Sequence, residues 1–285
     1  MTARTLTYLD ALAQFPEARI HTAHGVTGYH KAGAAHLRTL PVVLLHGIGS
    51  GAASWLRQLD ALGAHRRVFA WDTPGYGVST PVASAQPHAA DYAQALAAWL
   101  DALDIPRCVL VGHSLGAIIA GSFAARMQGR VAGLLLISPA AGYGAASKEE
   151  REKKRDARLA MLAELGAQGL ARERSANMLS PDADDAARDW VRWNMARIVP
   201  AGYAQATHLL ANADLAADVA RYEGRVAVAV GAHDAITPPV ACERIAQAAR
   251  VSLQVMPHAG HAGYVETPGA YTALIESFCT SADRP

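Results

Sequence analysis

The clearest chemical pattern in this 285-residue chain is Gly112-His113-Ser114-Leu115-Gly116, which matches G-x-S-x-G. The motif closes an apolar run that ends at Val111 and opens the helix-like run 117–120, so it predicts a strand, a sharp turn and a helix. A serine on so tight a turn has a strained backbone, and flanking glycines keep Cβ atoms away from the neighbouring strand and helix. The start of a helix also favours negative charge beside the serine. The pattern therefore predicts that Ser114 is a nucleophile.

A serine hydroxyl needs a base that takes its proton and a carboxylate that orients the base. Among twelve histidines, His261 stands out because it ends the short loop 257–261, between a strand-like run and the last helical run. Asp234 follows the apolar run 226–230 and precedes Pro238 and Pro239, which suit the first turn of a helix. Both side chains should lie beyond the carboxyl ends of strands. We predict His261 as the base and Asp234 as the orienting acid.

The elements that must position these residues follow a regular alternation. Five short apolar runs are too continuous to be strands with one exposed face, so each predicts a strand buried on both sides. These runs cover 41–45, 67–71, 108–112, 131–138 and 225–230, and helical spacing of apolar residues covers 52–62, 89–103 and 115–127. Strands alternating with helices predict a parallel sheet with helices on both faces.

One interval breaks this alternation. Between about residues 142 and 220 no strand-like run occurs, and ten of the eleven residues of 148–158 are charged. We interpret the charged run as a solvated helix. The chain is therefore expected to have a helical lid at 143–205 and a core formed by 1–142 and 206–285.

Within the predicted lid, Trp190, Trp193 and Arg197 fall at positions i, i+3 and i+7, on one face of a helix. Two interpretations stay open. The face packs the core of the lid, or it binds substrate, with the tryptophans lining a pocket and Arg197 meeting a carboxylate. The spacing favours the first, and the second is the hypothesis to be tested, with all three residues as candidate substrate-binding residues.

Composition and charge exclude several classes of protein. The chain is 51% hydrophobic and 18% charged, which suits a buried core and argues against disorder. A net charge of +1 gives no field that would hold nucleic acid or an acidic membrane, so neither is an expected partner. No apolar run reaches the roughly 18 residues that a membrane helix needs, and the first twenty residues lack a secretory signal pattern. We therefore expect a cytoplasmic protein.

The three cysteines contain no CxxC pair and no histidine at metal-ligand spacing. Their spacing predicts neither a disulfide framework nor a metal site.

Taken in order, these motifs resemble the α/β-hydrolase superfamily of serine hydrolases, from about Arg19 to the C-terminus. The resemblance rests on His46-Gly47, Asp72-Thr73-Pro74-Gly75-Tyr76-Gly77-Val78-Ser79, the motif around Ser114, Asp234 and Gly260-His261. It implies the α/β-hydrolase fold: a mostly parallel eight-stranded sheet with helices on both faces and a helical lid insertion.

Acyl transfer also needs N–H donors aimed at the oxyanion. The residue after the nucleophile supplies one donor through its backbone, so we expect the N–H of Leu115 to serve. The second should come from the loop after the strand ending at Leu45, and the resemblance implies the N–H of Ile48.

The substrate class is also implied by resemblance, to bacterial enol-lactonases, small-ester carboxylesterases and carbon–carbon hydrolases of aromatic meta-cleavage pathways. The last group usually has a tryptophan after the catalytic histidine, whereas this chain has Ala262-Gly263. We therefore expect a serine hydrolase that cleaves a small-molecule carboxylic ester or lactone through an acyl-enzyme, with no cofactor or metal. The alternatives are a carbon–carbon bond hydrolase and a low-turnover ligand-binding protein of the same fold. A small-molecule substrate is the expected partner, and homo-oligomerisation is left open.

Overall fold

The computed structural model describes residues 2–283, which form an eight-stranded sheet with the order β1-β2-β4-β3-β5-β6-β7-β8. β1 and β2 pair antiparallel, β2 pairs antiparallel with β4, and the strands from β4 to β8 are parallel. This confirms the predicted mostly parallel sheet. The strands are β1 (Ala18–Thr22), β2 (Gly25–Ala32), β3 (Val42–Leu45), β4 (Val68–Trp71), β5 (Cys108–His113), β6 (Val131–Ile137), β7 (Val226–Gly231) and β8 (Leu253–Met256).

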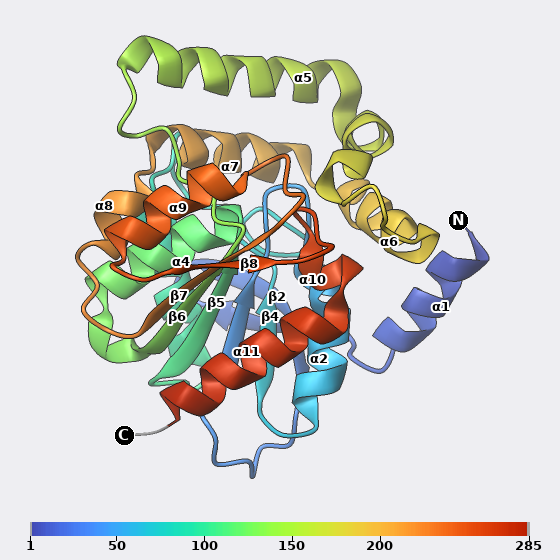
Figure 1. Ribbon diagram of the computed structural model, residues 1–285, viewed down its shortest axis with the longest axis vertical. Coiled ribbons are helices and arrows are strands. Elements are labelled where there is room, and N and C mark those ends of the chain that lie inside the picture. Colours follow the sequence, from blue (N-terminus) through green and yellow to red (C-terminus); the bar gives the residue numbers. More distant parts are fainter. Residues whose placement is uncertain (1, 284–285) are drawn as a thin grey trace.

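The side chains of the central strands belong to two hydrophobic cores, one on each face of the sheet. In β3, Val43 and Leu45 join the core under α3 (Ala89–Ala102) and α4 (Leu115–Arg126). Val42 and Leu44 face the opposite core, under α2 (Leu56–Gly63) and α11 (Pro268–Ala282). Successive side chains of a strand point to opposite faces, so a strand between two helical layers is apolar throughout. Figure 1 shows the sheet between these layers.

Shorter elements join these layers. The helical run predicted at 52–62 consists of a 3₁₀ turn followed by α2, and the last helical run is divided into two helices. The division falls at Pro268, which has no N–H to continue a helix and begins the next one instead. These elements are η1 (Ala52–Trp55), η2 (Gln128–Arg130), α8 (Leu215–Val219), α9 (Pro239–Ala248) and α10 (Gly263–Glu266).

Between β6 and β7 the chain leaves the sheet and forms a group of helices. They are α5 (Lys148–Arg174), η3 (Ser175–Met178), α6 (Asp185–Met195) and α7 (Pro200–Asn212), and we call residues 148–212 the helical insertion. α5 packs on α7 at one end of the molecule, whereas α6 lies beside α1 (Ala3–Leu12) (Figure 1). The boundary drawn at 205 from the sequence falls inside α7, which continues to Asn212.

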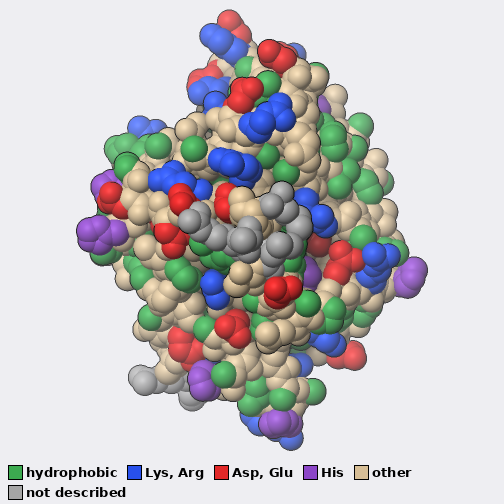
Figure 2. Space-filling view, turned by 90° about the vertical axis from the view of Figure 1, so that its right-hand side faces the viewer, with side chains coloured by type: hydrophobic (Ala, Val, Ile, Leu, Met, Phe, Trp, Pro, Cys, Tyr) green, Lys and Arg blue, Asp and Glu red, His purple; other side chains and the backbone are tan. Residues whose placement is uncertain are grey.

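α5 is two helical pieces rather than one. Gly166 breaks it with φ 58° and ψ −177°, a conformation that glycine adopts without a Cβ clash. At the other end, the Ser147 hydroxyl caps the helix by accepting the Glu150 N–H at 3.2 Å. Figure 2 shows Lys, Arg, Asp and Glu side chains mixed over the end of the molecule where α5 lies. Both pieces have buried residues, Leu162 before the break and Gly169, Leu170 and Ala171 after it.

Glu266 fastens the helical insertion to the loop before α10. Its carboxylate accepts the backbone N–H of Ser180, at 3.1 Å to each oxygen, and also contacts the Ser180 hydroxyl. It accepts the Gly260 N–H at 2.8 Å as well. A Cβ on Gly260 would lie 2.8 Å from Leu179 Cα, so the two segments pack backbone against backbone.

A second close approach joins the helical insertion to the turn after β4. A Cβ built on Gly202, near the start of α7, would lie 2.8 Å from Gly75 Cα and closer still to the Gly75 carbonyl. Gly75 itself has φ +84°, which favours glycine.

Within the described residues, no helix is both long and apolar enough to cross a membrane.

Candidate active site

Ser114 occupies the sharp turn between β5 and α4. Its backbone has φ 52° and ψ −113°, a strained conformation for a residue with a side chain. A Cβ on Gly112 would lie 2.7 Å from Ala117 Cα, and a Cβ on Gly116 would lie 2.7 Å from the Leu45 carbonyl carbon. Both flanking positions therefore require glycine, for the steric reason that the sequence suggested.

Asp234 and His261 lie together beyond the ends of the adjacent strands β7 and β8. His261 Nδ1 is 2.9 Å from Asp234 Oδ2 and 3.1 Å from Oδ1. Both side chains are almost completely buried. A proton on Nδ1 that is donated to the carboxylate leaves Nε2 as a lone-pair acceptor, which is the form a general base requires.

The loop that carries Asp234 also holds its carboxylate. The backbone N–H groups of Ile236 and Thr237 donate to Asp234 Oδ1 at 2.9 and 2.8 Å. The Thr237 hydroxyl lies 2.9 Å from Asp234 Oδ2 and 3.1 Å from His261 Nδ1. Thr237 is a contributor that the sequence analysis missed, and its place three residues after an acid on a loop is the pattern of a turn that caps a carboxylate.

These contacts determine the charge of Asp234. Burial raises the pKa of its carboxyl. The hydrogen bond and charge of His261 and the Thr237 N–H lower this pKa by more, so that it falls to about 2. The carboxylate is therefore ionised at neutral pH. A buried negative charge beside Nδ1 of His261 favours a proton on that nitrogen, which leaves Nε2 free to accept one.

His113, the residue before the serine, holds the loop of His261. Its Nε2 lies 2.9 Å from the carbonyl oxygen of His261, and the two rings are 4.7 Å apart. Burial and the nearby His261 lower the pKa of His113 well below its usual value, so the ring is neutral and its Nε2–H donates this bond. This role could not be predicted from the motif, in which any residue can occupy the position before the serine.

Ile48 and Leu115, the predicted oxyanion donors, both line the cavity that contains Ser114. Three contacts fix the loop of Ile48. His46 contacts the Gly47 carbonyl through Nδ1 at 2.8 Å and accepts the Thr73 N–H on Nε2 at 3.1 Å. The hydroxyl of Tyr76 donates to the carbonyl oxygen of Ile48 at 2.8 Å. Tyr76 is a second contributor that the sequence analysis did not identify.

The cavity has a volume of about 560 Å³, which suits a small molecule. Ser114 and His261 share it, but no hydrogen bond joins these two side chains among the described contacts. Its wall includes Ile48, Leu115, Lys154, Arg158, Met161, Arg174, Met195 and Tyr203. In residues 2–283 no three His, Cys, Asp or Glu side chains are grouped so that they could hold a metal ion.

Trp190, Trp193 and Arg197 do not line this cavity. Trp190 is 1% exposed and lies between Tyr8 of α1, at 4.9 Å, and Trp193, at 4.6 Å, with all rings nearly parallel. The Arg197 guanidinium covers Trp193 at 4.5 Å. The helical face predicted from the spacing exists, but α1 covers it.

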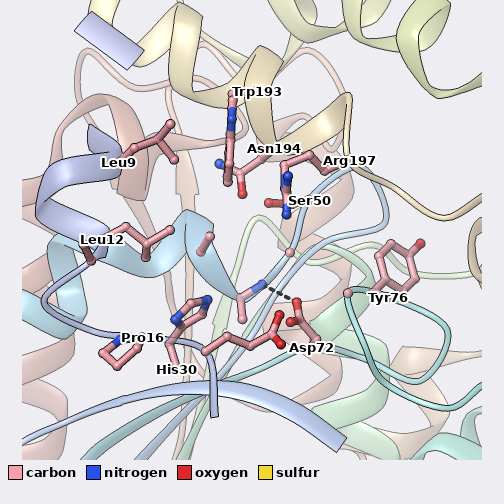
Figure 3. A pocket seen from close by; sticks show the side chains of 16 residues that line it. Leu9, Leu12, Pro16, His30, Ser50, Asp72, Tyr76, Trp193, Asn194 and Arg197 are labelled. Carbon is pink, nitrogen blue, oxygen red and sulfur yellow. Dashed lines mark hydrogen bonds between the residues drawn. The ribbon is translucent and has the colours of Figure 1, made fainter. Parts of the chain in front are cut away.

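Trp193 and Arg197 border a different cavity, of about 520 Å³, which Figure 3 shows. Its other walls include Leu9 and Leu12 of α1, and Asp72, which accepts the Ala52 N–H at 2.9 Å. Ser114 and His261 are not among its lining residues. The predicted contact of the three side chains with a substrate at Ser114 therefore has no support in this geometry.

Comparison with known sequences identifies relatives along most of the chain. A sequence model of the alpha/beta hydrolase family matches residues 42–274. A protein of Variovorax paradoxus (strain S110) named "Putative carbamate hydrolase RutD" is 31% identical over 260 residues, which are 86% of this chain and 93% of the relative.

Solved structures share the whole fold. A thermophilic esterase from Thermogutta terrifontis superposes with a TM-score of 0.82 at 25% identity, covering 94% of this chain and 99% of the esterase. The enol-lactonase from Burkholderia xenovorans LB400 superposes with a TM-score of 0.81 at 23% identity, covering 92% and 100%. The second likeness bears on the fold alone.

Proposed function

Because the chain belongs to the alpha/beta hydrolase family and is an enzyme of that family, we propose that it hydrolyses a small carboxylic ester or lactone through an acyl-enzyme on Ser114. One observation carries the proposal. Ser114, with its strained backbone, shares a cavity with His261, and His261 Nδ1 is bound to the buried, ionised carboxylate of Asp234. That arrangement supplies a nucleophile, a base and an orienting acid.

In the proposed reaction, Ser114 Oγ attacks the acyl carbon while His261 Nε2 accepts the hydroxyl proton. Asp234 stabilises the imidazolium that forms. The backbone N–H groups of Ile48 and Leu115 bind the oxyanion of the tetrahedral intermediate. His261 then gives its proton to the leaving alcohol, and water, deprotonated by the same ring, releases the acid from Ser114.

Carbamates are a second candidate, favoured by the name of the Variovorax relative. Their carbonyl carbon would be attacked by the same serine and held by the same oxyanion donors, so the chemistry of the site does not change. Carbon–carbon cleavage and low-turnover binding are not favoured by any feature of the cavity. A small-molecule substrate remains the partner that we propose.

The test is turnover of p-nitrophenyl butyrate with parallel labelling by a fluorophosphonate, which reacts with activated serines. We expect the wild-type enzyme to hydrolyse the ester and to be labelled on the peptide that contains Ser114. Ser114→Ala should lose turnover by at least about 10³-fold, since members of such a site act as a unit. Ser281→Ala, on α11, is the matched control and should keep full activity. Near wild-type turnover in folded Ser114→Ala would exclude the mechanism.

A further inference from the structure

We propose that the substrate carries a carboxylate besides the group that is cleaved, and that Arg158 of α5 binds this carboxylate. The inference rests on the proposed function, because it concerns the same cavity. It replaces the role that the sequence suggested for Arg197, whose side chain borders the other cavity.

The charges around the cavity are of one sign. Lys154, Arg158 and Arg174 line it, all from α5, and none of its lining residues is Asp or Glu. Lys154 and Arg158 are one helical turn apart, and Met161 continues the same face. Lys154 and Arg174 are exposed, whereas Arg158 is half-buried. The α5 side of the cavity therefore combines apolar side chains with one half-buried cation.

Among the described residues, Arg158 is bound to the phenols of Tyr203 and Tyr143 and to no carboxylate. Its Nη1 donates to Tyr203 Oη at 3.0 Å, and Tyr143 lies on the same cavity wall. A guanidinium has five N–H donors and stays charged, so phenol oxygens leave part of its fork for a ligand. Arg66 shows the contrast. It is more deeply buried than Arg158, but Glu276 and Asp283 neutralise it, at 2.9 and 3.1 Å.

The positions of these groups define the shape of the substrate. Ser114, His261 and the Ile48 loop lie on the sheet side of the cavity, whereas Arg158 projects from the helical insertion. A molecule that reaches from one wall to the other would present its acyl carbon to Ser114 and its carboxylate to Arg158. Monoesters of short dicarboxylic acids and lactones with a carboxylate side chain meet this description. A planar guanidinium suits a carboxylate because it can donate two parallel hydrogen bonds.

The experiment compares a neutral ester, p-nitrophenyl butyrate, with an anionic ester that carries a carboxylate on the terminal carbon of the same acyl chain, the mono-p-nitrophenyl ester of glutaric acid. In the wild-type enzyme kcat/KM should favour the anionic ester. Arg158→Gln should lower the ratio of kcat/KM for the anionic ester to that for the neutral ester by about 10- to 100-fold, the range expected for a lost charge-assisted hydrogen bond. Arg158→Lys should fall between the two.

Arg155→Gln is the matched control, because Arg155 is on the same helix but pairs with Asp156 at 2.7 Å and does not line the cavity. It should keep the wild-type ratio. Melting temperatures of all variants separate a folding defect from a change in selectivity. If Arg158→Gln keeps the wild-type ratio, or if Arg155→Gln lowers it equally, Arg158 does not bind the carboxylate.

A binding measurement separates this inference from the proposed function. Dissociation constants of glutarate and butyrate, measured by calorimetry, report the second carboxylate without any turnover. If the wild-type enzyme hydrolyses neither ester, the proposed function fails. The anion site then stands only if glutarate binds more tightly than butyrate and Arg158→Gln removes the difference. If the two acids bind equally to the wild-type enzyme, the anion site is overturned whatever the esters show.

Discussion

Asp234 makes the proposed mechanism testable at a single atom. Asp234→Asn keeps the shape of the side chain but removes the charge, and the amide can hold His261 in the wrong tautomer. We expect kcat for p-nitrophenyl butyrate to fall by about 10³- to 10⁴-fold in a folded protein. Asp218→Asn is the control, because this buried acid lies on α8, away from the cavity, and pairs with Arg221. A folded Asp234→Asn enzyme with wild-type kcat would mean that another group orients His261.

The same carboxylate predicts a dependence of stability on pH. Its pKa is about 2 in the folded protein, below the usual 3.8, so its ionised form stabilises the fold at all pH values above about 4. That contribution, about 2 kcal/mol, is lost as the pH falls from about 4 to about 2. The free energy of unfolding, measured with urea between pH 5 and pH 2, should fall by about this much more for the wild-type protein than for Asp234→Asn. Parallel curves would show that Asp234 has an ordinary pKa.

Tyr76 is a positioning residue for the oxyanion loop, and it has a matched control. Its hydroxyl donates to the Ile48 carbonyl, whereas the buried hydroxyl of Tyr92 has no hydrogen-bond partner among the described residues. Tyr76→Phe should lower kcat by about 2- to 10-fold with little change in KM, the effect of losing one ordinary hydrogen bond that holds an N–H in place. Tyr92→Phe should leave both constants unchanged. Equal effects of the two substitutions would argue for general packing.

At the scale of elements, the packing of α4 against β3 is the contact that places the nucleophile. Gly116→Ala would push a methyl group against the Leu45 carbonyl, so we expect a destabilisation of about 1–3 kcal/mol or failure to fold. Gly129→Ala, where a Cβ would meet nothing within 4 Å, should leave the denaturation midpoint nearly unchanged. A Gly116→Ala protein as stable as Gly129→Ala would mean that the helix and strand can move apart at no cost.

The central strands and the elbow could be predicted from the sequence because burial on both faces leaves an unbroken apolar run. β1 and β2 could not be located from their own residues. Their burial patterns are half-buried or mixed, and Ala18–Thr22 carries more polar than apolar side chains. Their place in the sheet depends on antiparallel pairing with distant residues, which no local pattern encodes.

The site shows a similar division. Ser114, Asp234 and His261 could be located because each follows a strand at the same edge of the sheet. The spacing of Trp190 and Trp193 identified a helical face but not the element that covers it, and α1 covers it. The charged run 148–158 looked like a solvated helix, so the inward side chain of Arg158 was missed. The apolar residues Met161 and Leu162, one turn later, were the sign that this face of the helix is covered.

At the scale of the whole molecule, stability should be unequal between the sheet and the helical insertion. α4 has ten buried residues of twelve, whereas only four of the twenty-seven residues of α5 are buried. Local opening costs least where few apolar contacts are lost. In hydrogen exchange followed by mass spectrometry, peptides from 148–160 should exchange first and peptides from β5 and α4 last. Equal protection of both would contradict this order.

The fastening of Ser180 and Gly260 by Glu266 also limits how the enzyme can be re-engineered. Exchanging the helical insertion for that of a relative is a natural way to alter selectivity, and it treats the insertion as independent of the core. Here the carboxylate of Glu266 binds both Ser180 of the helical insertion and Gly260 of the loop of His261, and Gly202 contacts Gly75. A donor segment without a serine opposite Glu266 and a glycine opposite Gly75 would disturb the base and the turn after β4. A graft should therefore transfer the residues on both sides of each contact, Ser180 with Glu266 and Gly202 with Gly75.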